Sequence, residues 1–328
     1  MRKHKDAIGF FDELRAVENI LIPHSGFTKV MSRLRKAIEF SQQGAEPRHT
    51  LLVGESGTGK TWLAQHFASL YPPRLNPDDV IGPIPVLIVE TPAIPSLKGL
   101  AEAMLMALGD PLFFKGTAAE KRNRALDLLR RRNVEFLVLD EFQHFLDHGK
   151  FDSLIAVSDW LKRFIDDASV PCLLMGLPRC EGILQVNEQL RRRFSSRLKL
   201  SAFSLDTMEG EREFRALVHQ IDKSLPTSEL SKLADVDMAR RLYFASNGLI
   251  GYLRPLITAA YELMVIEKAS KLDATIFEQT FIDVIWKDGL KSLNPFNKAF
   301  QFRQLNQIGE PFAPAPVHVR SVRARYRS

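Results

Sequence analysis

The sequence predicts an α/β domain with a parallel sheet between two helical layers, followed by a smaller all-helical domain. Four short apolar runs, at residues 50–53, 86–89, 136–139 and 172–175, alternate with segments long enough for helices. Apolar runs without polar alternation are typical of strands that are buried on both faces of a parallel sheet. After about residue 206 the helical patterns continue, but no further strand run appears. This change in pattern predicts two domains.

The chain divides into four predicted parts. They are, in order, an N-terminal helical extension (1–47), the α/β domain (48–205), the helical domain (206–290) and a flexible C-terminal tail (291–328). A fifth strand is expected within 197–203. The tail is expected to be flexible because it has little periodicity and several prolines. Its phenylalanines suit docking onto a partner or folding back onto the helical domain, and both interpretations stay open.

The composition favours a soluble globular protein. Of 328 residues, 45% are hydrophobic and 26% are charged, and no apolar run reaches the roughly 18–20 residues that span a bilayer. We therefore expect no membrane association, and no secretory signal, since no apolar stretch follows the basic N-terminus. With two cysteines, Cys172 and Cys180, a cytoplasmic, reducing compartment is expected. The net charge of +6 includes four arginines in the last nine residues, a pattern typical of nucleic-acid contact or of a solvated end.

A glycine-rich motif joins the first strand run to the following helix. Its residues are Gly54, Glu55, Ser56, Gly57, Thr58, Gly59, Lys60 and Thr61, which match G-x-x-x-x-G-K-[ST] at every fixed position. Backbone N–H groups of such a loop surround a phosphate, and the helix N-terminus adds a favourable dipole. We expect Lys60 to reach the β- and γ-phosphates and Thr61 to hold Mg²⁺. The motif therefore predicts binding of ATP with Mg²⁺.

A carboxylate pair follows the third strand run. Asp140 and Glu141 come directly after four apolar residues, at the strand end where ligands bind in such sheets. Asp140 is expected to bind Mg²⁺, and Glu141 to polarise the attacking water as a general base. The pair predicts ATP hydrolysis in addition to binding.

Two sets of arginines are candidates to complete the site. Three consecutive arginines, Arg191, Arg192 and Arg193, precede the last predicted strand. One of them, with Arg193 preferred and Arg192 next, is a candidate arginine finger for the nucleotide of a neighbouring subunit. Arg254, in the helical domain, is a candidate contact to the nucleotide. The alternative is that the arginines at 191–193 form a solvated helix end.

These motifs resemble those of the AAA+ ATPases, and within them the TniB and TnsC group of transposition regulators. The resemblance covers about residues 15–290 and rests on the glycine-rich loop and on five further stretches: 139–144 (Leu-Asp-Glu-Phe-Gln-His), 160–162, 173–176, 188–194 and 246–253. It implies an AAA+ domain with a helical lid, built from subunits that assemble into a ring or helical filament on double-stranded DNA. It also implies a link to a transposase and a TniQ-like target-selection protein in the bacterial cytoplasm, at the nucleoid when DNA is bound, with ATP hydrolysis driving disassembly.

One stretch departs from the AAA+ pattern. A polar sensor residue usually follows the fourth strand in these proteins, but here the stretch is Met175-Gly176-Leu177-Pro178. No polar side chain occurs until Arg179. We therefore expect hydrolysis to be slow and regulatory, or sensing to be performed by another residue.

The resemblance also indicates where DNA would bind. Proteins of this group contact duplex DNA through loops and helices after the second strand, where this chain offers Lys98, Lys121 and Arg122. Lysine and arginine contacts to phosphates give the sequence-independent affinity that such a regulator needs. The alternative is an ordinary solvated face of a charged helix.

Other kinds of function have less support in the sequence. His144 and His148 share a helical face, but the zinc-protease pattern around them is absent. We expect neither a zinc site nor DNA cleavage by this chain. Two rival functions share the ATPase motifs: a loader or helper ATPase in replication or repair, and a nucleotide-dependent signalling scaffold without DNA binding.

Overall fold

The computed structural model describes residues 2–21, 23–73, 82–148 and 151–314. The chain folds into two units, each with its own core: an α/β unit, Pro23–Ala202, and a helical unit, Met1–Ile22 with Phe203–Ser328. The predicted N-terminal extension is therefore divided between the two. Its first helix, α1 (Arg2–Glu18), belongs to the helical unit, and its second, α2 (Ser25–Gln42), belongs to the α/β unit.

The α/β unit is built on a five-stranded parallel sheet. In spatial order the strands are β2 (Val86–Glu90), β3 (Phe136–Asp140), β4 (Cys172–Gly176), β1 (Thr50–Val53) and β5 (Ser196–Lys199). All four apolar runs are strands, and the fifth predicted strand is present, though shorter than its predicted range. These strands run parallel, so their carboxyl ends lie at the same edge of the sheet. Because β4 lies between β1 and β3, the ends of these three strands are neighbours.

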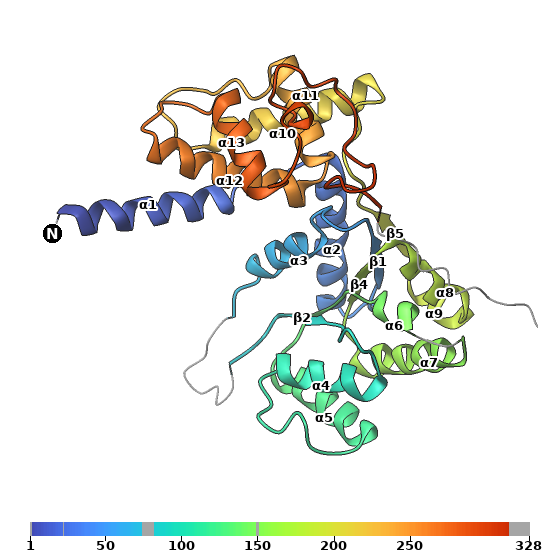
Figure 1. Ribbon diagram of the computed structural model, residues 1–328. Helices are drawn as coiled ribbons and strands as arrows, with labels where there is room; N and C mark the ends of the chain where they lie inside the picture. The colour runs from blue at the N-terminus through green and yellow to red at the C-terminus, as the bar shows by residue number, and fades with distance from the viewer. Residues whose placement is uncertain (1, 22, 74–81, 149–150, 315–328) are drawn as a thin grey trace, which may run out of the picture. The chain divides into compact units, whose positions relative to one another are not determined.

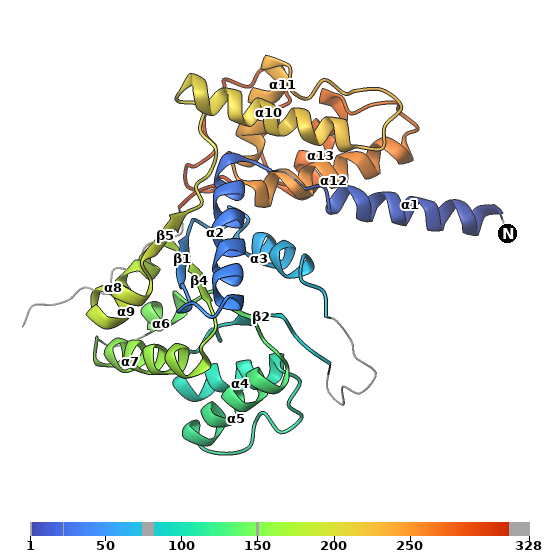
Figure 2. The same ribbon diagram turned by 180° about the vertical axis from the view of Figure 1, so that it is seen from behind.

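Alternate residues along each strand enter two separate cores. Leu52, Val138 and Leu173 pack with α2 and with α3 (Lys60–Ser69) on one face of the sheet. Leu51, Leu137 and Leu174 face the other core. That core is closed by α4 (Leu97–Ala107), α5 (Ala118–Arg131), α7 (Phe151–Ala168), α8 (Gly182–Gln185) and α9 (Glu188–Arg193). The predicted three-layer arrangement is thus confirmed, and Figures 1 and 2 show α2 and α3 apart from α4, α5 and α7.

The helical unit contains α1 together with four C-terminal helices: α10 (Met208–Ser224), α11 (Val236–Ser246), α12 (Ile250–Ile266) and α13 (Ala274–Val284). α1 packs on α12, where the Tyr261 hydroxyl donates to Glu13 Oε2 at 2.9 Å. In the described chain no single helix has the length and hydropathy to cross a bilayer; only α11 and α12 taken together, bent by 115°, satisfy that criterion.

The segment after α13 is part of the helical core. Phe296, Phe300 and Leu305 are buried, and the Phe296 ring stacks on Phe277 of α13 with centroids 5.0 Å apart. The expectation of a flexible tail is therefore wrong over residues 291–314. Of the two interpretations left open for the phenylalanines, the structure shows the one in which they fold back onto the helical domain, because apolar rings can enter a core without helical periodicity. The rest of that tail, 315–328 with its arginines, lies outside the described residues.

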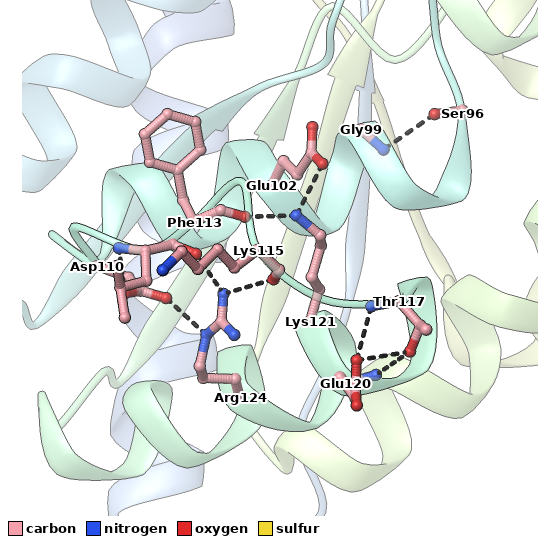
Figure 3. Close-up of polar contacts among 11 residues, drawn as sticks. Ser96, Gly99, Glu102, Asp110, Phe113, Lys115, Thr117, Glu120, Lys121 and Arg124 are labelled. Atoms are coloured by element: carbon pink, nitrogen blue, oxygen red, sulfur yellow. Dashed lines mark hydrogen bonds and ion pairs between the residues drawn. The ribbon is translucent and has the colours of Figure 1, made fainter.

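A buried ammonium group organises the connection between α4 and α5. The Lys121 side chain is 0% exposed, pairs with Glu102 of α4 at 2.8 Å, and donates to the carbonyl of Phe113 at 2.7 Å (Figure 3). Arg124 holds the same connection through Asp110 at 2.6 Å and the carbonyl of Leu112 at 2.8 Å.

α5 begins with a capping box formed by Thr117 and Glu120 (Figure 3).

These contacts correct one of the predicted DNA contacts. Lys121 cannot reach a DNA phosphate, because its ammonium is enclosed between α4 and the loop that follows it. The sequence did not reveal this, since a lysine on a basic helix looks solvated until its neighbours are known. Arg122 is mostly covered and pairs with Asp167 of α7. Of the three predicted contacts, Lys98 is the one with an exposed side chain.

We predict that Lys121→Met destabilises the protein. It removes the partner of Glu102 and leaves the carbonyl of Phe113 without a donor, at a cost of about 2 kcal/mol. Lys98→Met is the matched control on an exposed site and should stay within about 0.5 kcal/mol of wild type. Urea denaturation followed by circular dichroism measures both. Equal stability of the two variants would contradict the structural role of Lys121.

We also predict that Phe300→Ala destabilises the helical unit by about 3 kcal/mol, because it removes a buried ring from the core. Ile308→Ala serves as the control, since Ile308 is fully exposed in the same segment. Thermal unfolding of the two variants measures the difference. Similar melting temperatures would show that residues after α13 are not part of the core.

Candidate active site

The glycine-rich loop connects β1 to α3 at the carboxyl edge of the sheet. Gly57 and Gly59 have φ angles of 79° and 91°, in the left-handed region that glycine adopts without strain. α3 begins at Lys60, directly after Gly59. The Lys60 ammonium folds back into the loop and donates to the carbonyls of Gly54 at 2.7 Å and Glu55 at 3.0 Å. The loop is therefore wrapped around a cationic centre.

Lys60 is a buried cation with two carboxylates near it. Lys60 is 6% exposed. Burial lowers the pKa of its ammonium group, while the carboxylates of Glu141 and Asp140 act in the opposite direction. A buried ammonium costs free energy unless it is paired and hydrogen-bonded. Here carbonyl oxygens supply the hydrogen bonds, and the carboxylates supply compensating charge. An anion at this edge would meet a cation that is already in place.

Thr61 and Asp140 approach each other from different elements. The Thr61 hydroxyl, on the first turn of α3, donates to Asp140 Oδ2, at the end of β3, at 2.7 Å. Both groups offer hard oxygen atoms of the kind that Mg²⁺ prefers. The residues that the sequence predicted as metal ligands are thus adjacent, and their chemistry fits that ion.

Glu141 stands beside this pair in an unusual backbone conformation. Its φ angle is 54°, and its N–H donates to Asp140 Oδ1 at 2.8 Å. Non-glycine residues with positive φ are uncommon and are held there by their surroundings. The Glu141 carboxylate accepts a hydrogen bond from the side-chain amide of Gln143. His144 Nδ1 donates to the carbonyl of Thr91 at 3.0 Å, which anchors the turn to the end of β2.

Backbone hydrogen bonds join the glycine-rich loop after β1 and the turn after β3 to the end of β4. Gly54 N–H donates to the carbonyl of Gly176 at 3.1 Å, and Phe142 N–H donates to the carbonyl of Met175 at 3.0 Å. Lys60, Thr61, Asp140 and Glu141 are therefore brought together by the topology of the sheet. Gln143 was not among the predicted site residues. Its sequence signal was its place in the stretch 139–144 on which the family resemblance partly rests.

The arginines of α9 are not equivalent. Arg193 forms ion pairs within its own subunit, with Glu46 and with Asp166 at 3.1 Å. Arg192 is 78% exposed and pairs with Glu188 on the same helix at 2.6 Å. Arg191 is exposed and has no ion-pair partner within the described part of the chain. Since a finger must offer its guanidinium to another subunit, this geometry favours Arg191 over the preferred Arg193.

Arg254 is engaged inside the helical unit. It donates to the carbonyl of Ile20 at 3.1 Å and to that of Glu18, at the end of α1, and burial lowers its pKa to about 10. The bond to Glu18 satisfies a carbonyl that the last turn of α1 leaves open, and the bond to Ile20 holds the segment that follows the helix. Its contact with a nucleotide stays a prediction.

Comparison with known proteins assigns the family. The family described as "TniB: Bacterial TniB protein" matches residues 14–204, more than half of the chain. No curated protein matches the sequence.

Solved structures share the fold at low sequence identity. The Aeropyrum pernix ORC2 protein, solved as ADPNP–ADP complexes, is 17% identical with a TM-score of 0.58, over 82% of this chain and 71% of that one. Cdc6p from Pyrobaculum aerophilum is 13% identical with a TM-score of 0.59, over 82% and 70%. The Aeropyrum pernix ORC1 protein in complex with DNA is 16% identical with a TM-score of 0.56, over 82% and 67%.

These neighbours have the AAA+ fold, so the predicted fold class is confirmed. The chain belongs to the TniB family and has the AAA+ fold, a parallel α/β unit followed by a helical C-terminal region.

Proposed function

We propose that this protein is an ATP-dependent, DNA-binding regulator of transposition. The observation that carries the proposal is the convergence of Lys60, Thr61, Asp140 and Glu141 at one edge of the sheet. ATP would bind in the glycine-rich loop, and its hydrolysis would limit how long the protein stays assembled on double-stranded DNA. Membership of the TniB family supports the link to transposition.

The residues of the site divide the chemistry of phosphoryl transfer among them. Backbone N–H groups of the loop would hold the β-phosphate, with the Lys60 ammonium moving from carbonyl oxygens to phosphate oxygens. Thr61 and Asp140 would hold Mg²⁺, which when bound neutralises phosphate charge. Glu141 would accept a proton from the attacking water. Arg191 or Arg192 of a neighbouring subunit would stabilise the negative charge on the γ-phosphoryl group during its transfer.

Self-association and further partners follow from the same proposal. An arginine offered from one subunit to the next requires a ring or helical filament, and ATP would favour that assembly. A transposase and a TniQ-like target-selection protein would be the protein partners, in a bacterial cytoplasm. Hydrolysis would be slow, because the end of β4 carries no polar side chain from Gly176 to Pro178. A slow rate would suit a regulatory switch.

The DNA surface would use exposed cations after the second strand. Lys98 and Lys115 are exposed, and the similar fold of an ORC1 protein solved in complex with DNA supports DNA binding. The alternative function is a loader or helper ATPase in replication or repair, and it is supported by the fold shared with ORC and Cdc6 proteins. A scaffold without DNA binding gains support from the structural role of Lys121 and the ion pair of Arg122.

Binding to random-sequence duplex DNA tests the proposal. We predict cooperative binding with a non-hydrolysable ATP analogue and Mg²⁺, and little binding with ADP, without nucleotide, or for Lys60→Ala. Raising salt from about 50 to 200 mM should weaken binding roughly 10³-fold, because phosphate contacts release counterions. Lys98→Ala should reduce the salt slope by about one, whatever the DNA sequence. Fluorescence anisotropy measures all of these.

Two outcomes of that assay would redirect the assignment. Nucleotide binding without DNA affinity would replace the DNA-assembling switch with the scaffold. Nucleotide-dependent DNA binding together with capture of a helicase or clamp, and no effect on a transposase, would favour the loader.

A further inference from the structure

Gln143 links the Glu141 carboxylate to the end of β4. It lies two residues after Glu141 in the turn that follows β3, and it is 3% exposed. Its Oε1 accepts from Leu177 N–H at 3.1 Å, and its Nε2 donates to Glu141 Oε2. One side chain therefore joins two strand ends that both border the candidate site.

The orientation of the Gln143 amide is fixed by its partners. Leu177 N–H can only donate, so the amide oxygen must face it, and the NH₂ group is turned toward Glu141. An ionised carboxylate can only accept, which matches that orientation. The Cys180 thiol, 3.8 Å from the same amide oxygen, adds a weak donor. The pairing has one consistent arrangement.

The end of β4 is shaped to admit this side chain. A Cβ atom on Gly176 would lie 2.4 Å from Gln143 Oε1 and 2.3 Å from Cys180 Sγ, both too close for a real contact. Gly176 is also bonded through its carbonyl to Gly54 N–H of the glycine-rich loop. A side chain at this strand end would therefore displace the Gln143 amide that Gly176 accommodates.

We propose that Gln143 is the positioning residue for Glu141. The backbone N–H of Leu177 holds the Gln143 amide, which thereby links the Glu141 carboxylate to the end of β4, where no polar side chain is present from Gly176 to Pro178. The inference rests on the proposed ATP hydrolysis. Gln143 touches neither nucleotide nor water in this role; it fixes where the Glu141 carboxylate points. The left-handed backbone of Glu141 directs the side chain, and the amide of Gln143 restrains its far end.

Gln143→Met tests the link with little change in side-chain length. We expect kcat to fall on the order of 10- to 100-fold while KM for ATP stays unchanged, because general-base geometry is lost and nucleotide contacts are kept. In a Glu141→Gln background, Gln143→Met should produce no further loss, since Gln143 acts through Glu141. Gln65→Met, at an exposed position on α3, is the matched control and should leave both constants unchanged.

Gln143→Glu separates the two hydrogen bonds of the amide. Glutamate keeps an acceptor for Leu177 N–H but cannot donate to Glu141 while ionised, so kcat should fall as in Gln143→Met. Placing two carboxylates together should also lower the melting temperature. The double variant Glu141→Gln with Gln143→Glu restores a donor–acceptor pair in the opposite sense, and its melting temperature should recover.

The outcomes distinguish this inference from the proposed function. Unchanged or increased kcat in Gln143→Met, or a rise in KM that accounts for the loss, would overturn the positioning role. If wild type hydrolyses ATP no faster than Lys60→Ala, the proposed hydrolysis fails, and the melting temperatures then decide the link alone. An equal loss of melting temperature from Gln143→Glu in both backgrounds would overturn it.

Discussion

The placement of β4 between β1 and β3 is the constraint on which the site depends. In a parallel sheet all carboxyl ends point the same way, so the loops that leave β1 and β3 emerge on either side of β4. Each loop is bonded to the last residues of β4 through a backbone N–H, from Gly54 and from Phe142. Residues far apart in the sequence, such as Thr61 and Asp140, are thereby held within hydrogen-bond distance.

Charge burial at this edge follows from that geometry. Lys60 is withdrawn from water. Carbonyl oxygens of its own loop, the Asp140 carboxylate at the end of β3 and the Glu141 carboxylate that follows it offset part of the cost. The same device appears at Lys121, where a buried ammonium meets one carboxylate and one carbonyl. The two buried lysines differ in their place in the fold. Lys60 lies at the carboxyl ends of the strands, where ligands bind in such sheets, whereas Lys121 holds the connection between α4 and α5.

Much of the fold was predictable because its signals are local. Apolar runs such as that at 136–139 are typical of strands buried on both faces of a parallel sheet, and the glycine-rich motif fixes its own loop and helix start. What sequence reasoning missed or left open depends on tertiary partners. Lys121 resembles any surface lysine until Glu102 of α4 is placed beside it. The sequence left open whether Phe300 docks onto a partner or folds back onto the helical domain, because the tail has no helical periodicity, and the structure places the ring in that domain's core. Gln143 belongs to a motif, but its role needs the distance to Leu177, on the neighbouring strand end.

Calorimetric titration of ATP with Mg²⁺ into wild type and Lys60→Ala tests the central claim most directly. If the glycine-rich loop and its buried ammonium form the nucleotide site, wild type should bind ATP and Lys60→Ala should lose at least about tenfold in affinity, since a charge-assisted contact to phosphate is removed. The far-ultraviolet circular dichroism of the two proteins should match, which shows that the fold is intact. Equal affinity of the two folded proteins would contradict the account, because ATP would then bind without the one cation that the loop encloses.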